Sequence, residues 1–433
     1  MSLLDALFAI PILLLCSAVS AAVAPLDKPS MAVKVEVGKY VVGGETIKVD
    51  HDVELSIEPP DRVSVKGEAV VLTDEKPQAW HMGTALKKTL GPVDTGTRLP
   101  KAIVPESVKV YADGKVYEEG KDYFLDHDWG GLCRLEGGSI PKGAKVMVDY
   151  EVYLQRVDSV MRYDDGTVFV RKGVSASICP EPPEQFRKST LLANIYIPYR
   201  TTAITADNIC PMPKKDISWM DFVKVSGREY LSNTLGLLKA GKPVTVVCWG
   251  DSVTCGGSAV PYERSYVELF RARLKAAYPN ANITLINAGI GGSNTDSRRD
   301  GFEKEVLSHN PGLITVEFVN DAGMSSEKIK HNWDEFIARA RAKNPKVEFI
   351  LITPHWVMPE WMGNFDKSIP AMRQAALDNK VALADTTYIW ENLRSLGIPY
   401  ETLEANGINH PNNLGHEFFA ECLMRLMKPE GNR

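Results

Sequence analysis

The sequence predicts a chain in which a β-rich region precedes a doubly wound α/β sheet. Its 433 residues exceed what one compact core usually holds, so two domains are expected. Short runs with a period of two fill residues 33–199, whereas longer apolar runs alternate with helical stretches beyond residue 243. We therefore expect a β-rich accessory region over 31–200, a linker and helix over 201–241, and an α/β domain over 242–430.

Composition and charge exclude several classes of protein. The chain is 44% apolar and 24% charged, which is typical of a folded globular protein. Its 50 Lys and Arg against 55 Asp and Glu give a net charge of -5, so it has no basic surplus to neutralise a nucleic acid backbone. We expect a folded protein with no nucleic acid partner.

The N-terminus has the layout of a secretory signal. An apolar run over residues 6–16 is followed by small residues. We expect residues 1–24 to hold a signal peptide, cleaved after Ala21 or Ala22, and the protein to be secreted or periplasmic. Because the first residues carry no basic side chain, an uncleaved membrane anchor is the alternative.

Six cysteines follow this segment, too few for a disulfide framework in a chain of this length. Cys179 and Cys210 flank one segment and are the best candidate pair, whereas Cys248 lies in an apolar run and is expected to be a buried thiol. The sequence has no Cys/His spacing of a zinc site, and residues 126–128 (Asp-His-Asp) are more typical of a loop. No metal site is predicted.

The β-rich region alternates apolar and polar residues in short runs such as 33–37, 146–148 and 168–170, with Gly-bearing turns between them. This pattern is typical of antiparallel strands in a sandwich or in two small β modules. We favour a spacer or packing role over a carbohydrate-binding or surface-binding role, since sandwiches serve many purposes and no binding face is visible in the sequence.

Five continuous apolar runs in the second half suit parallel strands that are buried on both faces. They cover residues 244–249, 283–286, 313–319, 347–352 and 381–384. The stretches between them are long enough for crossover helices, which predicts a doubly wound sheet. Another helix is expected over residues 221–239.

Polar residues follow these runs, at the edge where an open parallel sheet binds its ligands. They include Gly250-Asp251-Ser252, Asn287 to Gly292, Asn320-Asp321 and Thr353-Pro354-His355, and near the C-terminus stands His410-Pro411-Asn412. Hydrolysis through a serine needs a hydroxyl, an imidazole that takes its proton, and donors for the developing oxyanion. All three kinds of group are present.

These motifs resemble, in order and spacing, blocks I, II, III and V of the SGNH or GDSL hydrolase superfamily, over about residues 243–427. The resemblance implies a flavodoxin-like sheet and a carboxylic ester hydrolase that needs no cofactor. It implies Ser252 as the nucleophile and His410 as the general base. The Ser252 N–H, the Gly292 N–H and the Asn320 side chain are then the oxyanion donors.

Two positions depart from that family pattern. Phe318 stands where block III usually has Gly, and Gly407 stands where the catalytic acid usually lies, three residues before His410. In the serine-protease template, loss of the acid lowers turnover by roughly ten-thousand-fold. Either Ser252 and His410 act as a dyad, with a backbone carbonyl orienting the ring, or another group substitutes. The candidates for that group are Asn406, Glu404 and Asp321.

Aromatic residues after the fourth run, His355-Trp356 and Trp361, offer either a surface that binds a sugar ring or loop packing. By analogy with the carbohydrate esterases of the superfamily, we expect an O-acyl ester, above all O-acetyl, on a small molecule or polysaccharide. A membrane partner is expected only if the N-terminal segment stays uncleaved. The alternative function is that of a catalytically inactive carbohydrate-binding or scaffold protein.

Overall fold

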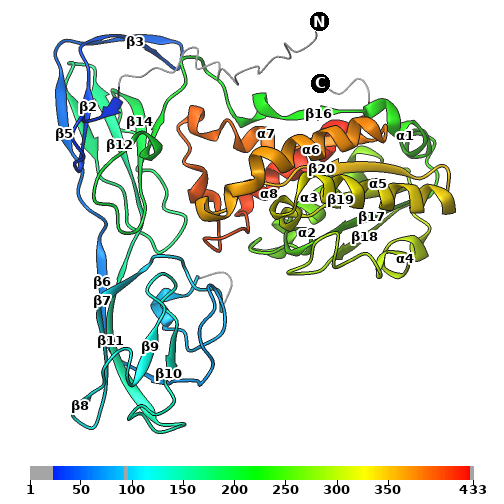
Figure 1. The fold of residues 1–433 in the computed structure, drawn as a ribbon. Coiled ribbons are helices and arrows are strands. Elements are labelled where there is room, and N and C mark those ends of the chain that lie inside the picture. Colours follow the sequence, from blue (N-terminus) through cyan, green and yellow to red (C-terminus); the bar gives the residue numbers. More distant parts are fainter. Residues whose placement is uncertain (1–22, 92–95, 430–433) are drawn as a thin grey trace, which may run out of the picture.

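The computed structural model describes residues 23–91 and 96–429, in which two β modules lie beside an α/β domain (Figure 1). The predicted signal peptide lies outside the described residues as far as residue 22. Within the described ranges, no helix is both long and apolar enough to cross a membrane.

The α/β domain is built on a six-stranded sheet with the order β16-β21-β20-β19-β17-β18. Its strands are β16 (Lys224–Ser226), β17 (Val244–Gly250), β18 (Ile283–Gly289), β19 (Leu313–Glu317), β20 (Glu348–Ile352) and β21 (Ala382–Asp385). Strands β17 to β21 are parallel and coincide with the five predicted runs. Their spatial order, second-first-third-fourth-fifth, is the flavodoxin-like order, which confirms the predicted fold class.

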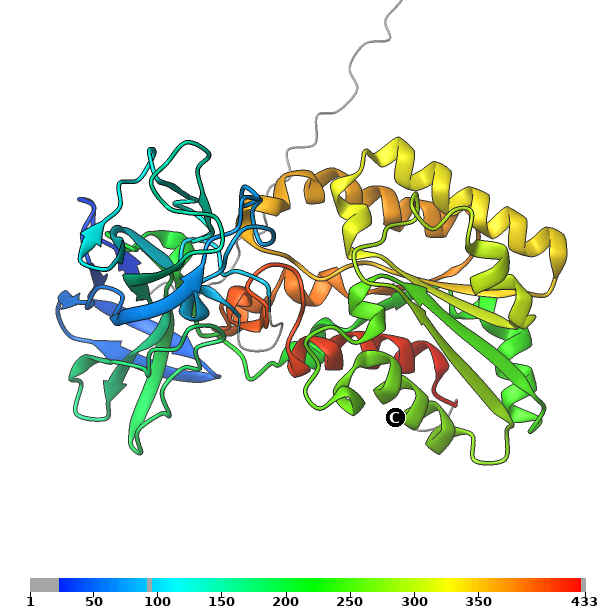
Figure 2. The same ribbon diagram turned by 90° about the horizontal axis from the view of Figure 1, so that it is seen from below.

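Helices cover both faces of this sheet, α3 and α8 on one face and α5 and α6 on the other (Figure 2). The helices are α1 (Ser232–Lys239), α2 (Ser252–Cys255), α3 (Tyr266–Ala277), α4 (Phe302–Glu305), α5 (Ser326–Lys343), α6 (Phe365–Asp378), α7 (Thr387–Trp390) and α8 (Asn413–Met427). The apolar face of α3, with Val267, Phe270 and Leu274, is fully buried. Asn412 caps α8 by accepting hydrogen bonds from two backbone N–H groups.

The first β module joins two stretches of chain that lie far apart in the sequence. Its strands are β1 (Val23–Pro25), β2 (Ala32–Val35), β3 (Gly38–Val42), β4 (Glu45–Val49), β5 (Val53–Ser56), β12 (Arg156–Tyr163), β13 (Val168–Arg171), β14 (Ser189–Ile197) and β15 (Ile209–Pro211). All of its pairings are antiparallel, and both stretches contribute to one apolar core.

The second β module is inserted between β5 and β12 of the first (Figure 1). Its strands are β6 (Arg62–Val71), β7 (Ile103–Ala112), β8 (Lys115–Val116), β9 (Tyr123–Leu125), β10 (Leu132–Arg134) and β11 (Lys145–Tyr153). It has a separate core, and β11 buries every second residue, as expected for a strand with one face on that core. Two small β modules are therefore the correct one of the two predicted arrangements.

The predicted helix over residues 221–239 is wrong over residues 221–231, because only the 8 residues of α1 at its end are α-helical. Before it, β16 pairs antiparallel with β21 at the edge of the sheet. Gly227 ends that strand in the left-handed conformation, and a Cβ there would lie 2.7 Å from the Val381 carbonyl oxygen. The segment predicted as a linker thus contributes an edge strand.

The predicted disulfide between Cys179 and Cys210 is also wrong, because both are thiols. Cys179 packs beside the small cluster of Leu99 and Ala102, whereas Cys210 lies on β15 with its sulfur 3.8 Å from the Arg394 guanidinium. Burial raises the pKa of both thiols to about 12. Cys248 is a fully buried thiol on β17, as predicted.

The β modules pack against the segment that precedes His410. Asn194 on β14 donates a hydrogen bond of 2.8 Å to the Gly397 carbonyl, and Lys101 forms an ion pair with Glu360 across the interface. A Cβ on Gly407 would lie 3.0 Å from a Leu99 methyl group. The β modules therefore contact the turn formed by residues 404–410, which we call the His410 turn.

Candidate active site

Ser252 lies at the point where β17 ends and α2 begins, at the carboxyl-end rim of the sheet. The Asp251 side chain caps α2 by accepting a hydrogen bond of 3.0 Å from the Val253 N–H. Gly250 is required here, since a Cβ would lie 2.0 Å from Thr254 Oγ1 and 2.2 Å from the Glu317 carbonyl oxygen. This tight strand-to-helix turn holds the Ser252 hydroxyl at the rim.

His410 is presented by a turn that one side chain organises. Asn406 Oδ1 accepts hydrogen bonds of 3.0, 2.9 and 2.9 Å from the backbone N–H groups of Ile408, Asn409 and His410. His410 Nε2 lies 2.8 Å from Ser252 Oγ. The structure therefore brings the predicted nucleophile and the predicted base into hydrogen-bond contact across 158 positions of sequence.

The other ring nitrogen, His410 Nδ1, lies 3.4 Å from the Ser258 hydroxyl. A Cβ on Gly257 would lie 2.8 Å from this nitrogen, so only glycine lets the loop approach the ring so closely. The Gly257 carbonyl oxygen lies 3.0 Å from His416 Nε2. The sequence analysis missed Gly257 and Ser258; the Gly-Gly-Ser stretch after α2 is the signal that points to them.

Two of the predicted oxyanion donors, Gly292 and Asn320, follow β18 and β19, the strands on either side of β17. A Cβ on Gly291 would lie 3.9 Å from Ser252 Cβ, which places this loop beside the nucleophile, and the next residue, Gly292, is exposed in the left-handed conformation. Asn320 follows β19 and donates a hydrogen bond of 2.9 Å from Nδ2 to the Ser293 carbonyl oxygen. Arg298 fixes the same loop by donating to the Gly250 and Ala288 carbonyl oxygens.

Asp251 links the nucleophile turn to the Asn320 turn. One carboxylate oxygen caps α2, and the other accepts a hydrogen bond of 3.1 Å from the Asn320 N–H. Asp251 is fully buried, and burial raises its pKa to about 6. This carboxyl group therefore joins the turn that carries Ser252 to the backbone of Asn320, which are both predicted to supply oxyanion donors.

Comparison with known proteins identifies the family of the α/β domain. Residues 248–418 match the model of the GDSL-like Lipase/Acylhydrolase family. The C-terminal domain is a GDSL-like hydrolase domain. Lipases and acylhydrolases are carboxylic ester hydrolases, so the predicted enzyme class is confirmed.

Individual relatives of the GDSL-like domain are more distant. An acetylxylan esterase from Geobacillus stearothermophilus is 26% identical over 212 residues, which cover 43% of this chain and 95% of that protein. The solved structure of a two-domain esterase (CEX) active on acetylated mannans is 21% identical, with a TM-score of 0.41 over 47% of this chain. This match spans 54% of that esterase, about half its length. A putative GDSL-like lipase from Parabacteroides merdae is 18% identical, with a TM-score of 0.38 over 42% of this chain and 95% of its own.

Two of the three candidates for the missing acid accept hydrogen bonds from other groups. Asp321 accepts hydrogen bonds from the Thr295 N–H and from Trp333 Nε1, and Asn406 organises the His410 turn. Glu404 is 2% exposed, and its carboxyl oxygens have no hydrogen-bond partner among the described residues. Burial raises the Glu404 pKa well above its ordinary value.

The prediction that His355 offers an aromatic surface to a ligand is wrong, because its side chain is fully buried. His355 Nε2 lies 2.9 Å from the Asn409 carbonyl oxygen and 3.7 Å from Glu404, so His355 supports the His410 turn from inside. Burial lowers its pKa to about 3. Trp356 is half-buried and packs edge-on against Tyr400, with the ring centroids 4.9 Å apart. The contact of Trp356 with substrate stays a prediction.

Phe318, the departure in block III, points into the core of the GDSL-like domain. It is 1% exposed and packs edge-on against Trp249 at 4.8 Å. Its side chain therefore fills the interior behind the rim. Among the residues that the structure describes, no group of three or more His, Cys, Asp or Glu is arranged to hold a metal ion.

Proposed function

We propose that the protein is a serine esterase that removes acetyl groups from O-acetylated carbohydrate, with Ser252 as the nucleophile and His410 as the base. The 2.8 Å contact between Ser252 Oγ and His410 Nε2 carries this proposal. Ser252 Oγ attacks the ester carbonyl while His410 takes its proton. His410 then returns the proton to the departing sugar hydroxyl, and a water molecule activated by His410 releases acetate from Ser252.

Three donors surround the oxygen that becomes negative during attack. They are the N–H groups of Ser252 and Gly292 and the side-chain amide of Asn320. Because an amide nitrogen carries two hydrogens, Asn320 Nδ2 keeps its bond to the Ser293 carbonyl and has a second hydrogen for the oxyanion. This chemistry calls for no metal or organic cofactor.

The proposed substrate rests on the similarity to an acetylxylan esterase. The match covers 95% of the acetylxylan esterase of Geobacillus stearothermophilus. Nearly all of that protein is therefore similar to the GDSL-like domain, which supports a similar substrate class for this domain. An acetyl ester on a polysaccharide or oligosaccharide is therefore the proposed substrate class. Export of the protein stays a prediction, since the signal segment lies outside the described residues.

The test compares the full chain with Ser252→Ala and His410→Gln on p-nitrophenyl acetate and on acetylated xylo-oligosaccharides. Each substitution is expected to lower kcat by at least about a thousand-fold, as loss of a nucleophile or base does in serine hydrolases. Ser308→Ala, an exposed serine of the same domain, is the control and keeps full activity. Equal background rates for all four proteins would leave the inactive binding protein as the correct alternative.

A further inference from the structure

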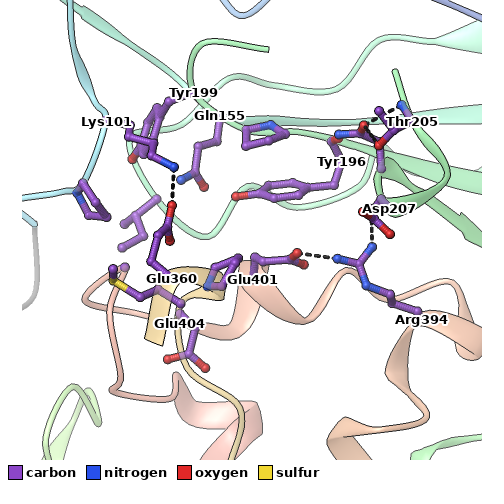
Figure 3. Close-up of a pocket in the computed structure, with 17 residues that line it drawn as sticks. Lys101, Gln155, Tyr196, Tyr199, Thr205, Asp207, Glu360, Arg394, Glu401 and Glu404 are labelled. Atoms are coloured by element: carbon purple, nitrogen blue, oxygen red, sulfur yellow. Dashed lines mark hydrogen bonds and ion pairs between the residues drawn. The ribbon is translucent and has the colours of Figure 1, made fainter. Parts of the chain in front are cut away.

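A cavity of about 320 Å³ lies between the β modules and the GDSL-like domain (Figure 3). Both sides contribute polar side chains to its walls: Lys101, Gln155, Tyr196, Glu360, Arg394 and Glu401. Gly407, which belongs to the His410 turn, also lines it. The volume is in the range of small-ligand sites, so the interface holds a site-sized space directly behind the turn that carries the base.

The charged side chains around this cavity disfavour binding of an anionic ligand. Lys101 forms an ion pair with Glu360, and Arg394 forms one with Glu401 (Figure 3). Asp207 also lines the cavity, so carboxyl groups outnumber the cations. A phosphate or carboxylate ligand would meet paired cations and an excess of acidic side chains, and both are unfavourable.

Two acceptors at the cavity lack donors. Gln155 Oε1, in a residue that is 7% exposed, and Glu401 Oε2 have no hydrogen-bond partner among the described residues. Gln155 and the Tyr196 hydroxyl point into the cavity toward one another (Figure 3). Because a buried acceptor without a donor costs free energy, a ligand that brings hydrogen-bond donors is favoured there.

We propose that this cavity binds one uncharged, hydroxyl-rich sugar unit of the glycan substrate. The sugar hydroxyls donate to Gln155 Oε1 and Glu401 Oε2, and the Tyr196 hydroxyl serves as donor or acceptor. The apolar face of the sugar ring packs against Ile178 and the Tyr196 ring, which also line the cavity. This inference rests on the proposed function, because the glycan that carries the ester supplies the unit, and it adds a site apart from Ser252 and His410.

Binding is measured by calorimetry on the full chain with Ser252→Ala, which cannot turn over, using unacetylated xylo- and manno-oligosaccharides as probes. Adding Gln155→Leu removes the unpartnered acceptor and keeps the side chain's size, so we expect affinity to fall about tenfold or more. Tyr196→Phe removes only a hydroxyl and is expected to weaken binding about three- to fivefold. Because it keeps the ring in the core, it also serves if the Gln155→Leu protein does not fold.

Gln374→Leu makes the same exchange on the exposed face of α6 and is expected to leave affinity unchanged. Equal affinity of Gln155→Leu and Gln374→Leu, within twofold, would overturn the proposal. So would binding of cationic glucosamine oligomers more than tenfold tighter than neutral oligomers, since that result assigns the cavity to an ammonium group.

Activity on p-nitrophenyl acetate separates failure of this proposal from failure of the proposed function. The ester has no sugar, so it reports on the hydrolytic site alone. In the otherwise unchanged chain, Gln155→Leu is expected to raise the KM for acetylated oligosaccharides, whereas Gln374→Leu is expected to keep the parent's kinetics on both esters. An active enzyme that binds no neutral oligosaccharide would refute the sugar site and leave the esterase. A full chain without turnover of either ester would refute both.

Discussion

The β modules and the GDSL-like domain bury charged groups in opposite ways. In the β modules the two most deeply buried arginines are satisfied: Arg156 pairs with Asp158 at 2.7 Å, and the Arg98 guanidinium donates to backbone carbonyl oxygens such as that of Met82 at 2.6 Å. In the GDSL-like domain, Glu404 and one oxygen of Glu317 have no hydrogen-bond partner within the described ranges. Burial raises the pKa of both carboxyl groups well above its ordinary value.

This difference separates regions built for stability from a region built for chemistry. Unsatisfied buried carboxyl groups lower stability, and they concentrate where a protein needs shifted pKa values. Asp251, Asp321 and His355, whose pKa values are also shifted, all follow strands at the carboxyl-end rim. The four predictions below test whether stability and activity divide between the regions in this way.

Arg156→Met is expected to have the largest effect on stability. It leaves the buried Asp158 carboxylate without its ion pair, which costs about 3–5 kcal/mol of unfolding free energy. The activity of the folded enzyme on p-nitrophenyl acetate should not change, since Arg156 lies in the first β module. Urea unfolding and kcat at low temperature measure the two effects.

The control for that change is Arg425→Met, which removes an exposed arginine of α8 and should cost less than about 1 kcal/mol, because its partner Glu421 keeps its ion pair with Lys428. If Arg156→Met lowered kcat as well as the unfolding free energy, the geometry of the active site would depend on the β modules. The comparison between the two regions would then be wrong.

Asp251→Asn tests the active-site region and is expected to lower kcat/KM about 10- to 100-fold. The two carboxylate oxygens accept from the N–H groups of Val253 and Asn320, so an amide NH2 must face one of these donors. An unpaired buried donor costs about 1–3 kcal/mol, and 1.4 kcal/mol is tenfold in rate. Steady-state kinetics on p-nitrophenyl acetate give the value.

Asp296→Asn, an exposed carboxyl group in the neighbouring rim loop, is the matched control and should keep kcat/KM within about twofold. A similar loss in both variants would mean that charge near the rim, rather than the geometry held by Asp251, governs the rate.

The sequence was sufficient to predict the sheet of the GDSL-like domain and the positions of Ser252 and His410. Strands buried on both faces read as continuous apolar runs, and residues that follow such runs meet at one rim. Predicting that Ser252 and His410 meet therefore needs only local patterns and the rule that the carboxyl ends of parallel strands lie at one rim. Both are visible in a single sequence.

Other features depend on packing between distant segments, which a local pattern does not encode. The burial of His355 follows from contacts with Trp390 and Phe419, and Ser258 meets His410 only because Gly257 lets the loop approach. The insertion of one β module into the other is equally invisible, since the alternation is the same in both. The assignment of β16 likewise depends on its pairing with β21, a distant segment, so the local pattern of residues 221–239 predicts a helix there instead.

His355→Gln is expected to change how stability depends on pH. Burial lowers the His355 pKa to about 3, so between pH 3 and 6.5 the unfolded chain binds a proton that the folded chain does not. This group therefore makes stability fall as the pH falls through that window, by up to about 1.4 kcal/mol per pH unit. The variant should lose that slope, which urea unfolding at pH 4, 5 and 6 measures. His331→Gln, on the exposed side of α5, is the control, and an identical slope in His355→Gln and the parent would contradict the burial argument.

Glu404→Gln is expected to have the smallest effect. Burial without a hydrogen-bond partner favours the neutral carboxylic acid, and an amide has the same size and the same lack of charge. Unfolding free energy at pH 4, where Glu404 is largely neutral in the folded and the unfolded chain, should therefore stay within about 1 kcal/mol of the parent, and kcat at pH 6 within about twofold. Because the Glu404 pKa is raised on folding, its carboxyl group makes the parent less stable as the pH rises, so the variant should gain relative stability toward pH 8. A tenfold loss of kcat would instead show that Glu404 works as an ionised group beside His355 and the His410 turn, and the unsatisfied carboxyl would then be part of the catalytic machinery.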